Sequence, residues 1–146
     1  MLKEFIKAKG QLSIVLTGPD GRVRERRHLK NLVVTVGLGF IASRMVAASA
    51  NVMSHMAVGT NATAPSLANT ALGAEAARVG LTSAAAVGPV VTYVGTFGPG
   101  SGTGALTEAG IFNAGVAGDM LNRVTFPVVN KQAGDTLAIS WTVTLS

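Results

Sequence analysis

The stretch GPGSGTGALTEAGIFNAGVAGDMLNRVTF, residues 98–126, decides the fold of this chain. It contains two short apolar runs, residues 105–112 and 120–126. Between them lie the seven residues NAGVAGD, whose glycine, asparagine and aspartate residues favour a turn. The stretch therefore predicts a β-hairpin.

One carboxylate, Glu108, lies within the first apolar run of this hairpin. Burying it without a partner would cost on the order of several kcal/mol. A register that places Ile111 opposite Met120 also places Glu108 opposite Arg123. We therefore predict a structural ion pair between Glu108 and Arg123, with Arg78 as an alternative partner, rather than an active-site acid.

Similar short segments, separated by Gly, Pro, Asn and Asp turns, recur along the chain. In the last of them, alternation directs Leu137, Ile139, Trp141, Val143 and Leu145 toward a core. The pattern predicts an all-β fold, a jelly-roll-like β-sandwich of about eight or nine strands with one helix after the third strand. Strands are expected at residues 11–17, 22–30, 31–36, 53–59, 81–85, 90–97, 105–112, 120–126 and 137–145, with the helix at 40–50 and a helical turn at 72–78.

The charge of the chain is concentrated at its N-terminal end. Residues 1–30 contain eight Lys or Arg and three Asp or Glu residues, whereas residues 31–146 contain four of each. We expect one domain over residues 1–146, with a basic N-terminal β-hairpin (1–30) and a neutral sandwich body (31–146). Only 13% of all residues are charged and 48% are hydrophobic, which favours surfaces covered by other subunits of a homo-oligomer.

Residues 22–30 form a basic strand in this pattern. Alternation places Arg22, Arg24, Arg26, His28 and Lys30 on one face. The row can be a solvated edge, where Lys and Arg discourage unwanted strand pairing. It can also be an electrostatic docking surface for an acidic partner protein. Direct nucleic-acid binding is disfavoured, because no aromatic residues interleave with the arginines and the rest of the chain is neutral.

No group of residues points to catalysis, a metal or a cofactor. His28 and His55 have no nucleophile or acid at compatible spacing, and the seven carboxylates form no close pair. The segment GLGFIA at residues 37–42 is similar to a dinucleotide-binding fingerprint, but no acidic residue follows a second strand about 20 residues further on. The glycine run at residues 98–104 lacks the Lys-Ser/Thr pair of a phosphate loop. We expect a protein that is not an enzyme and binds no cofactor.

Membrane insertion and disulfide chemistry are not indicated either. The chain has no cysteine, which excludes disulfides and thiolate metal sites. The N-terminal MLKEFIKAKG lacks the apolar segment of a secretory signal. The longest apolar run, residues 32–50, contains Arg44 and two glycines and is a poor transmembrane candidate.

Several segments between residues 31 and 146 resemble a recurrent type of tailed-bacteriophage virion structural protein. They are NLVVTVGLGFIASRM, HMAVGTNATAP, TALGAEAARVGLTS, TGALTEAGIFNAG, MLNRVTFPVVNK and DTLAISWTVTL. The resemblance implies a capsid decoration (cement) protein, a homo-oligomer (dimer or trimer) that binds the outer head surface and stabilises the lattice of the major capsid protein. It also implies a location on the capsid surface of the virion, after synthesis in the host cytoplasm.

Related patterns occur in tail-fibre and baseplate modules of tailed phages, and these are the alternative role. Fibre proteins usually continue into long repeats, whereas this chain stops at the sandwich. The small size and the neutral surfaces of the chain favour the decoration role.

Overall fold

The computed structural model describes residues 6–46 and 50–146. In chain order they form β1 (Ala8–Thr17), β2 (Val23–Val33), α1 (Thr35–Ser43), β3 (His55–Gly59), β4 (Glu75–Gly80), β5 (Ser83–Val87), β6 (Val90–Phe97), β7 (Gly104–Phe112), β8 (Met120–Lys131) and β9 (Thr136–Leu145). The described residues thus contain nine strands and one helix, and the predicted all-β fold is confirmed.

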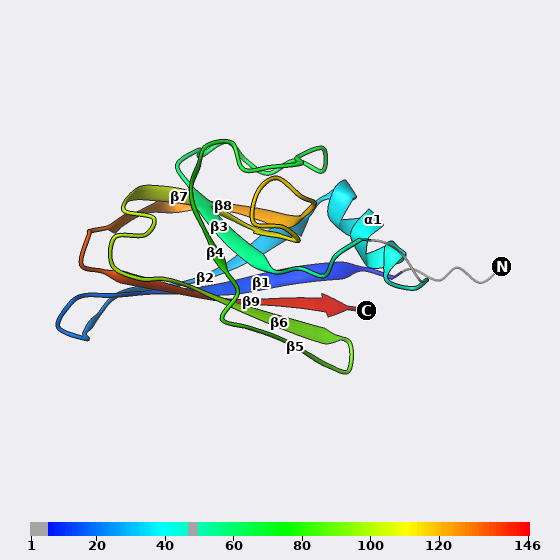
Figure 1. Ribbon diagram of the computed structural model, residues 1–146, viewed down its shortest axis with the longest axis horizontal. Helices are drawn as coiled ribbons and strands as arrows, with labels where there is room; N and C mark the ends of the chain where they lie inside the picture. Colours follow the sequence, from blue (N-terminus) through cyan, green and yellow to red (C-terminus); the bar gives the residue numbers. More distant parts are fainter. Residues whose placement is uncertain (1–5, 47–49) are drawn as a thin grey trace.

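These strands belong to one antiparallel sheet that curls back on itself into two layers (Figure 1). The strand order is β4-β3-β7-β8-β2-β1-β9-β6-β5. One layer contains β1, β9, β6, β5 and most of β2, and the other contains β4, β3, β7 and β8. The fold is sandwich-like, as predicted, but its two layers are parts of one continuous sheet.

Strand β2 connects the two layers. Its residues 23–31 pair with β1, whereas only Leu32 and Val33 pair with β8 (Figure 1). The prediction of two strands at 22–30 and 31–36 is therefore wrong, because a single strand turns the corner between layers. The helix consequently follows the second strand, and the predicted boundary between a basic hairpin and a neutral body falls inside β2.

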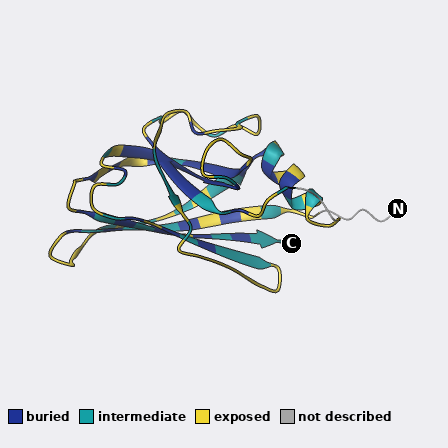
Figure 2. Ribbon diagram, in the orientation of Figure 1, coloured by how far each residue is buried: buried dark blue, intermediate teal, exposed yellow. Residues whose placement is uncertain are grey.

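The core lies between the two layers (Figure 2). Side chains alternate along the strands because every second residue points toward this core. In β9 the side chains of Leu137, Ile139, Trp141 and Val143 are buried, as predicted, while Leu145 at the end of the strand is half-buried. The residues between them are exposed or half-buried. This layer therefore has one face on the core and one face on solvent.

The layer that contains β3, β7 and β8 is buried on both faces. Ala109 and Ile111 of β7 belong to the main core, whereas Phe112 packs in a second cluster that includes Leu72. Leu72 belongs to the connection of residues 60–74 between β3 and β4, which lies over the outer face of this layer (Figure 1). The predicted hairpin is thus the centre of the fold, and this connection covers it.

The helical segments lie elsewhere than predicted. Helix α1 spans Thr35–Ser43 instead of residues 40–50, of which 47–49 lie outside the described residues. The predicted helical turn at residues 72–78 is wrong, because β4 begins at Glu75 and pairs with β3, and such tertiary pairing overrides a local helical preference. No helix in the described part of the chain is long and apolar enough to cross a membrane.

Candidate docking surface

The basic strand alternates as the sequence predicts. Arg24, Arg26, His28 and Lys30 of β2 are exposed, while the residues between them are half-buried. Arg22 lies outside the strand, in the turn that joins β1 to β2. The five predicted residues therefore do not form one uniform row.

Carboxylates neutralise two of these five side chains. Arg22 lies 3.9 Å from Asp20 in the exposed turn. Arg24 donates hydrogen bonds of 2.8 and 3.0 Å to the two carboxylate oxygens of the buried Asp135. Asp135 also accepts a hydrogen bond from the backbone N–H of Gln132 at 2.8 Å. Arg24 thus holds the β8–β9 turn and is a structural residue.

The remaining three residues, Arg26, His28 and Lys30, have no ion-pair partner among the described residues. The other basic residue of the strand, Arg27, pairs with Glu25 and donates to the carbonyl oxygens of Pro127 (2.7 Å) and Val128 (3.1 Å) on β8. Arg27 therefore ties β2 to β8 where the two strands no longer pair. Within β2, the positive charge available to a partner therefore lies on the exposed side of the strand.

This exposed side continues across three neighbouring strands, because the strand registers bring their outward residues into line. The neighbours are small or neutral and include no Asp or Glu. We call this surface the docking face; it comprises Arg26, His28 and Lys30 of β2, Gln11, Ser13 and Val15 of β1, Ala138, Ser140 and Thr142 of β9, and Thr92, Val94 and Thr96 of β6.

The structure contains the predicted ion pair of the hairpin, but the predicted register is wrong. Arg123 lies opposite Gly110, and Glu108 lies opposite Thr125, because Met120 pairs with Phe112 instead of Ile111 and the pairing shifts by one more residue between Ile111 and Phe112. The Arg123 side chain reaches diagonally along β7, and its Nε donates to Glu108 Oε1 at 3.1 Å. Diagonal neighbours on one face of a sheet are within reach of long side chains.

Glu108 also holds the connection that covers the hairpin. Its Oε2 accepts backbone N–H bonds from Asn61 (2.9 Å) and Ala74 (2.8 Å), and its Oε1 accepts one from Gly73 (2.8 Å). Both carboxylate oxygens are therefore occupied, and the side chain is fully buried. Such a carboxylate is a structural anchor and is not placed to transfer a proton to a substrate.

Arg78, the alternative partner, does not contact Glu108 and holds a different loop. It pairs with Glu75 at 2.7 Å and donates to the carbonyl oxygens of Ala114 (2.9 Å) and Ala117 (2.8 Å). Its guanidinium carbon also lies 3.8 Å from the centre of the Phe112 ring. The pair with Glu75 forms within a strand, where a bulge brings the two side chains to the same side.

The other sequence features with possible chemistry have structural surroundings. His55 Nδ1 hydrogen-bonds the Ser54 hydroxyl at 2.8 Å. The carbonyl of Gly98, at the start of the glycine run, accepts a 2.9 Å hydrogen bond from Lys131 Nζ. Burial lowers the pKa of Lys131, while the nearby Asp135 carboxylate opposes the shift. Across residues 6–46 and 50–146, no three His, Asp or Glu side chains form a group that could hold a metal ion.

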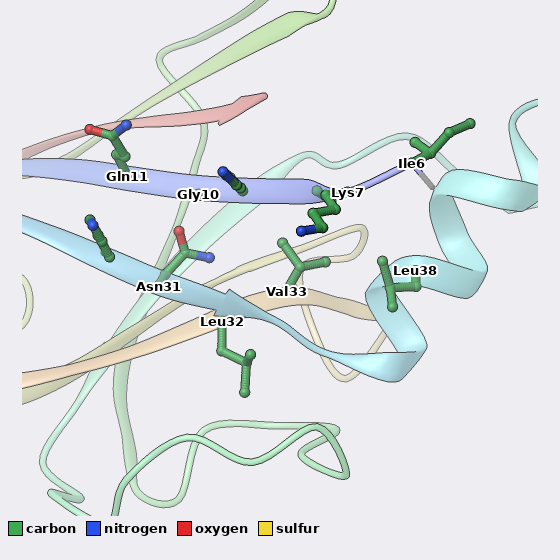
Figure 3. A pocket seen from close by; sticks show the side chains of 11 residues that line it. Ile6, Lys7, Gly10, Gln11, Asn31, Leu32, Val33 and Leu38 are labelled. Carbon is green, nitrogen blue, oxygen red and sulfur yellow. The ribbon is translucent and has the colours of Figure 1, made fainter. Parts of the chain in front are cut away.

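Sequence reasoning missed a cleft between β1 and β2, which is lined in part by Lys7, Lys9, Lys30 and Asn31 (Figure 3). Its position depends on where the two strands separate, and no local pattern marks that point.

No family model, curated protein or solved structure matches the chain.

Proposed function

We propose that this chain is a non-enzymatic structural protein of a tailed-phage virion, a decoration protein that docks on the outer surface of the head. One observation carries the docking role: Arg26, His28 and Lys30 are exposed in a row on a face that contains no carboxylate. A partner surface with aspartate or glutamate residues would supply the opposite charges. The proposed partner is the major capsid protein, whose lattice the bound copies would stabilise.

The rest of the docking face suits adhesion without chemistry. Its small neutral side chains allow a partner to approach closely, and they bring few charges that must lose their hydration. Exposed ion pairs are weak individually, with a typical value of about 0.2–1 kcal/mol each. Strong binding to a lattice would therefore come from many repeated contacts made by linked copies.

We expect replacement of Arg26, His28 and Lys30 by serine to weaken binding to purified capsid shells about tenfold, as the loss of two exposed ion pairs of modest strength, at Arg26 and Lys30, would. The difference should shrink as salt is raised, because the Debye length falls from about 10 Å at 0.1 M to about 3 Å at 1 M. Cosedimentation across a salt series measures both effects. The control variant, Arg22→Ser, removes an exposed positive charge outside the docking face. Equal weakening by both variants would contradict the proposal.

The number of copies per particle tests the location. A decoration protein should be present in many copies on the head, detected by quantitative staining of purified particles and by density on the shell. A few copies confined to the tail tip would instead establish the tail-fibre or baseplate role.

Self-association would use the apolar end of the molecule beside α1. A cavity of about 680 Å³ lies there and is lined mainly by apolar side chains. Met45 and Val52 line it and are 82% and 57% exposed, and Arg44 is the only charged residue that the described part of the chain contributes to its lining. A second copy would cover this surface without bringing the positive charges on the β2 strands of the two copies together. In the strand order, β1 and β9 separate β2 from β6 and β5.

Val52→Asp should raise the dissociation constant of the homo-oligomer by at least about tenfold, because an unpaired charge in an apolar contact is costly. Light scattering over a concentration series measures the change. The control is Val116→Asp, an 86% exposed residue in the β7–β8 loop. A wild-type chain that is monomeric at all concentrations would contradict the proposed self-association.

A further inference from the structure

The cleft between β1 and β2 forms because these strands separate before their pairing is complete (Figure 3). Their register extends to Gly10 opposite Asn31 and would next place Lys9 opposite Leu32 and then Ala8 opposite Val33. At that point β1 continues along β9, whereas β2 turns to β8. The resulting cavity has a volume of about 620 Å³.

Both walls of the cleft present backbone groups of the kind found at a free strand edge. Lys7 exchanges two backbone hydrogen bonds with Ser146 of the β9 end, at 2.6 and 2.9 Å. Because successive residues of a strand direct their backbone groups to opposite sides, the N–H and C=O of Ala8 face the cleft. On the other wall, Val34 bonds to β8, so the backbone groups of Val33 face the cleft.

The side chains that line the cleft supply positive charge and an unused donor. Lys7, Lys9 and Lys30 belong to the lining, and no Asp or Glu among the described residues does. Asn31 Oδ1 accepts a 2.9 Å hydrogen bond from the Trp141 indole, and the buried amide Nδ2 has no hydrogen-bond partner among the residues that the structure describes. In Figure 3 the Lys7 side chain and the Asn31 amide nitrogen both point into the space between the strands.

Gly10 makes this position of the amide possible. A Cβ at residue 10 would lie 1.7 Å from Asn31 Oδ1, so any side chain would displace the asparagine. A buried donor without an acceptor destabilises the folded protein, and a bound acceptor would recover part of that loss. The cleft is therefore suited to an anionic group that also accepts hydrogen bonds.

The other lining residues indicate which class of anionic ligand fits the cleft. Within residues 6–46 and 50–146 the lining includes Ile6, Leu32, Val33 and Leu38, and neither an arginine nor an aromatic residue. Phosphate recognition favours arginine forks, and single-stranded nucleic acid favours aromatic platforms. Free backbone groups beside apolar side chains instead fit an extended peptide.

We propose that the cleft binds an extended acidic peptide segment of a partner protein, with its carboxylate between Lys7 and Asn31 and an apolar neighbour against Leu32 and Leu38. The cleft is continuous with the docking face, because Gln11 and Lys30 belong to both. The inference rests on the proposed function for the identity of the partner. The peptide-binding property itself is independent of that identity.

The test is an NMR titration of the whole protein with the acetylated and amidated peptide Gly-Leu-Asp-Leu-Gly. The Asp peptide should shift the backbone amides of Ala8 and Val33 and the side-chain amide of Asn31. A matched peptide with Asn in place of Asp should bind at least about tenfold more weakly, because it lacks the charge-assisted hydrogen bonds. Lys7→Gln with Lys30→Gln should cause a similar loss, whereas Arg26→Gln, outside the cleft lining, should not.

Equal affinity for both peptides would overturn the proposal, as would shifts that avoid Ala8, Val33 and Asn31. The same shifts produced by inorganic phosphate alone would also overturn it, because the cleft would then bind any small anion. The result separates this inference from the proposed function. Peptide binding without capsid binding would reject only the capsid as partner, and capsid binding without peptide binding would reject only the cleft.

Discussion

Replacing Glu108 with glutamine should lower the free energy of unfolding by about 3–5 kcal/mol, because the change leaves Arg123 as an uncompensated buried charge. The two side chains are 0% and 3% exposed. The carboxylate also accepts three backbone N–H groups of the connection at residues 60–74, and an amide offers only one acceptor oxygen in place of two. Urea unfolding followed by the fluorescence of the buried Trp141 measures the change.

Glu75→Gln is the matched control, because it removes a carboxylate from another Arg pair of the same layer. Glu75 is 36% exposed, and Arg78 keeps its hydrogen bonds to two loop carbonyls after the change. We expect a loss below about 1 kcal/mol for this variant. If Glu108→Gln lowers the free energy of unfolding no more than Glu75→Gln does, Glu108 is not a structural anchor.

A double-mutant cycle tests the pair directly. Combining Glu108→Gln with Arg123→Met removes both charges, so the double variant should be more stable than the sum of the single losses predicts. Hydrogen exchange of residues 60–74 should accelerate most in Glu108→Gln, since this carboxylate holds both ends of the connection. Unchanged hydrogen exchange of residues 60–74 would mean that Glu108 pairs with Arg123 but does not hold the connection in place.

The individual strands could be predicted because each carries its own local signal. β6 has the predicted bounds at Val90–Phe97, and β9 begins one residue before the predicted strand. In both, side chains alternate between the core and the outer face. Period-two alternation depends only on which face is buried, so it is visible without knowledge of the neighbouring strands.

The register of the hairpin could not be predicted, because its first pair and one irregularity each displace all the pairs beyond them. Met120 lies opposite Phe112 instead of Ile111, and the shift beside Ile111 adds one more residue, so Arg123 lies opposite Gly110 instead of Glu108. The ion pair survives the error, because an arginine spans the diagonal distance between neighbouring strands. The three N–H donors for Glu108 come from residues 34 to 47 positions earlier in the chain, and no local pattern connects them.

The division of β2 into two predicted strands has a similar cause. The sequence changes from basic to apolar between Lys30 and Asn31, and such a change resembles the end of an element. In the structure it marks the passage of one strand from a layer with a solvent face to a layer buried on both faces. The cleft at this corner depends on two strand pairings, and sequence alternation specifies neither.

Gly37→Ala should lower the free energy of unfolding by about 2–3 kcal/mol, because the added methyl group has no space between α1 and β8. A Cβ at this position would lie 2.0 Å from the carbonyl oxygen and 2.7 Å from the carbonyl carbon of Leu121. These are backbone atoms of β8 and cannot rotate aside. The helix would have to move outward, which would loosen the packing of Phe40 in the main core. Urea unfolding measures the loss.

Gly39→Ala, two residues further along the same helix, is the matched control and should have the opposite effect. A Cβ there meets no atom within 4 Å, and Gly39 is exposed. Alanine is favoured over glycine in a helix by about 0.8–1 kcal/mol, so this variant should gain a fraction of that amount. Changes of the same sign would contradict close packing as the reason for Gly37. The two alanine variants also test the similarity of residues 37–42 to a dinucleotide-binding fingerprint. A phosphate-binding turn uses its successive glycines together, whereas close helix packing needs only Gly37.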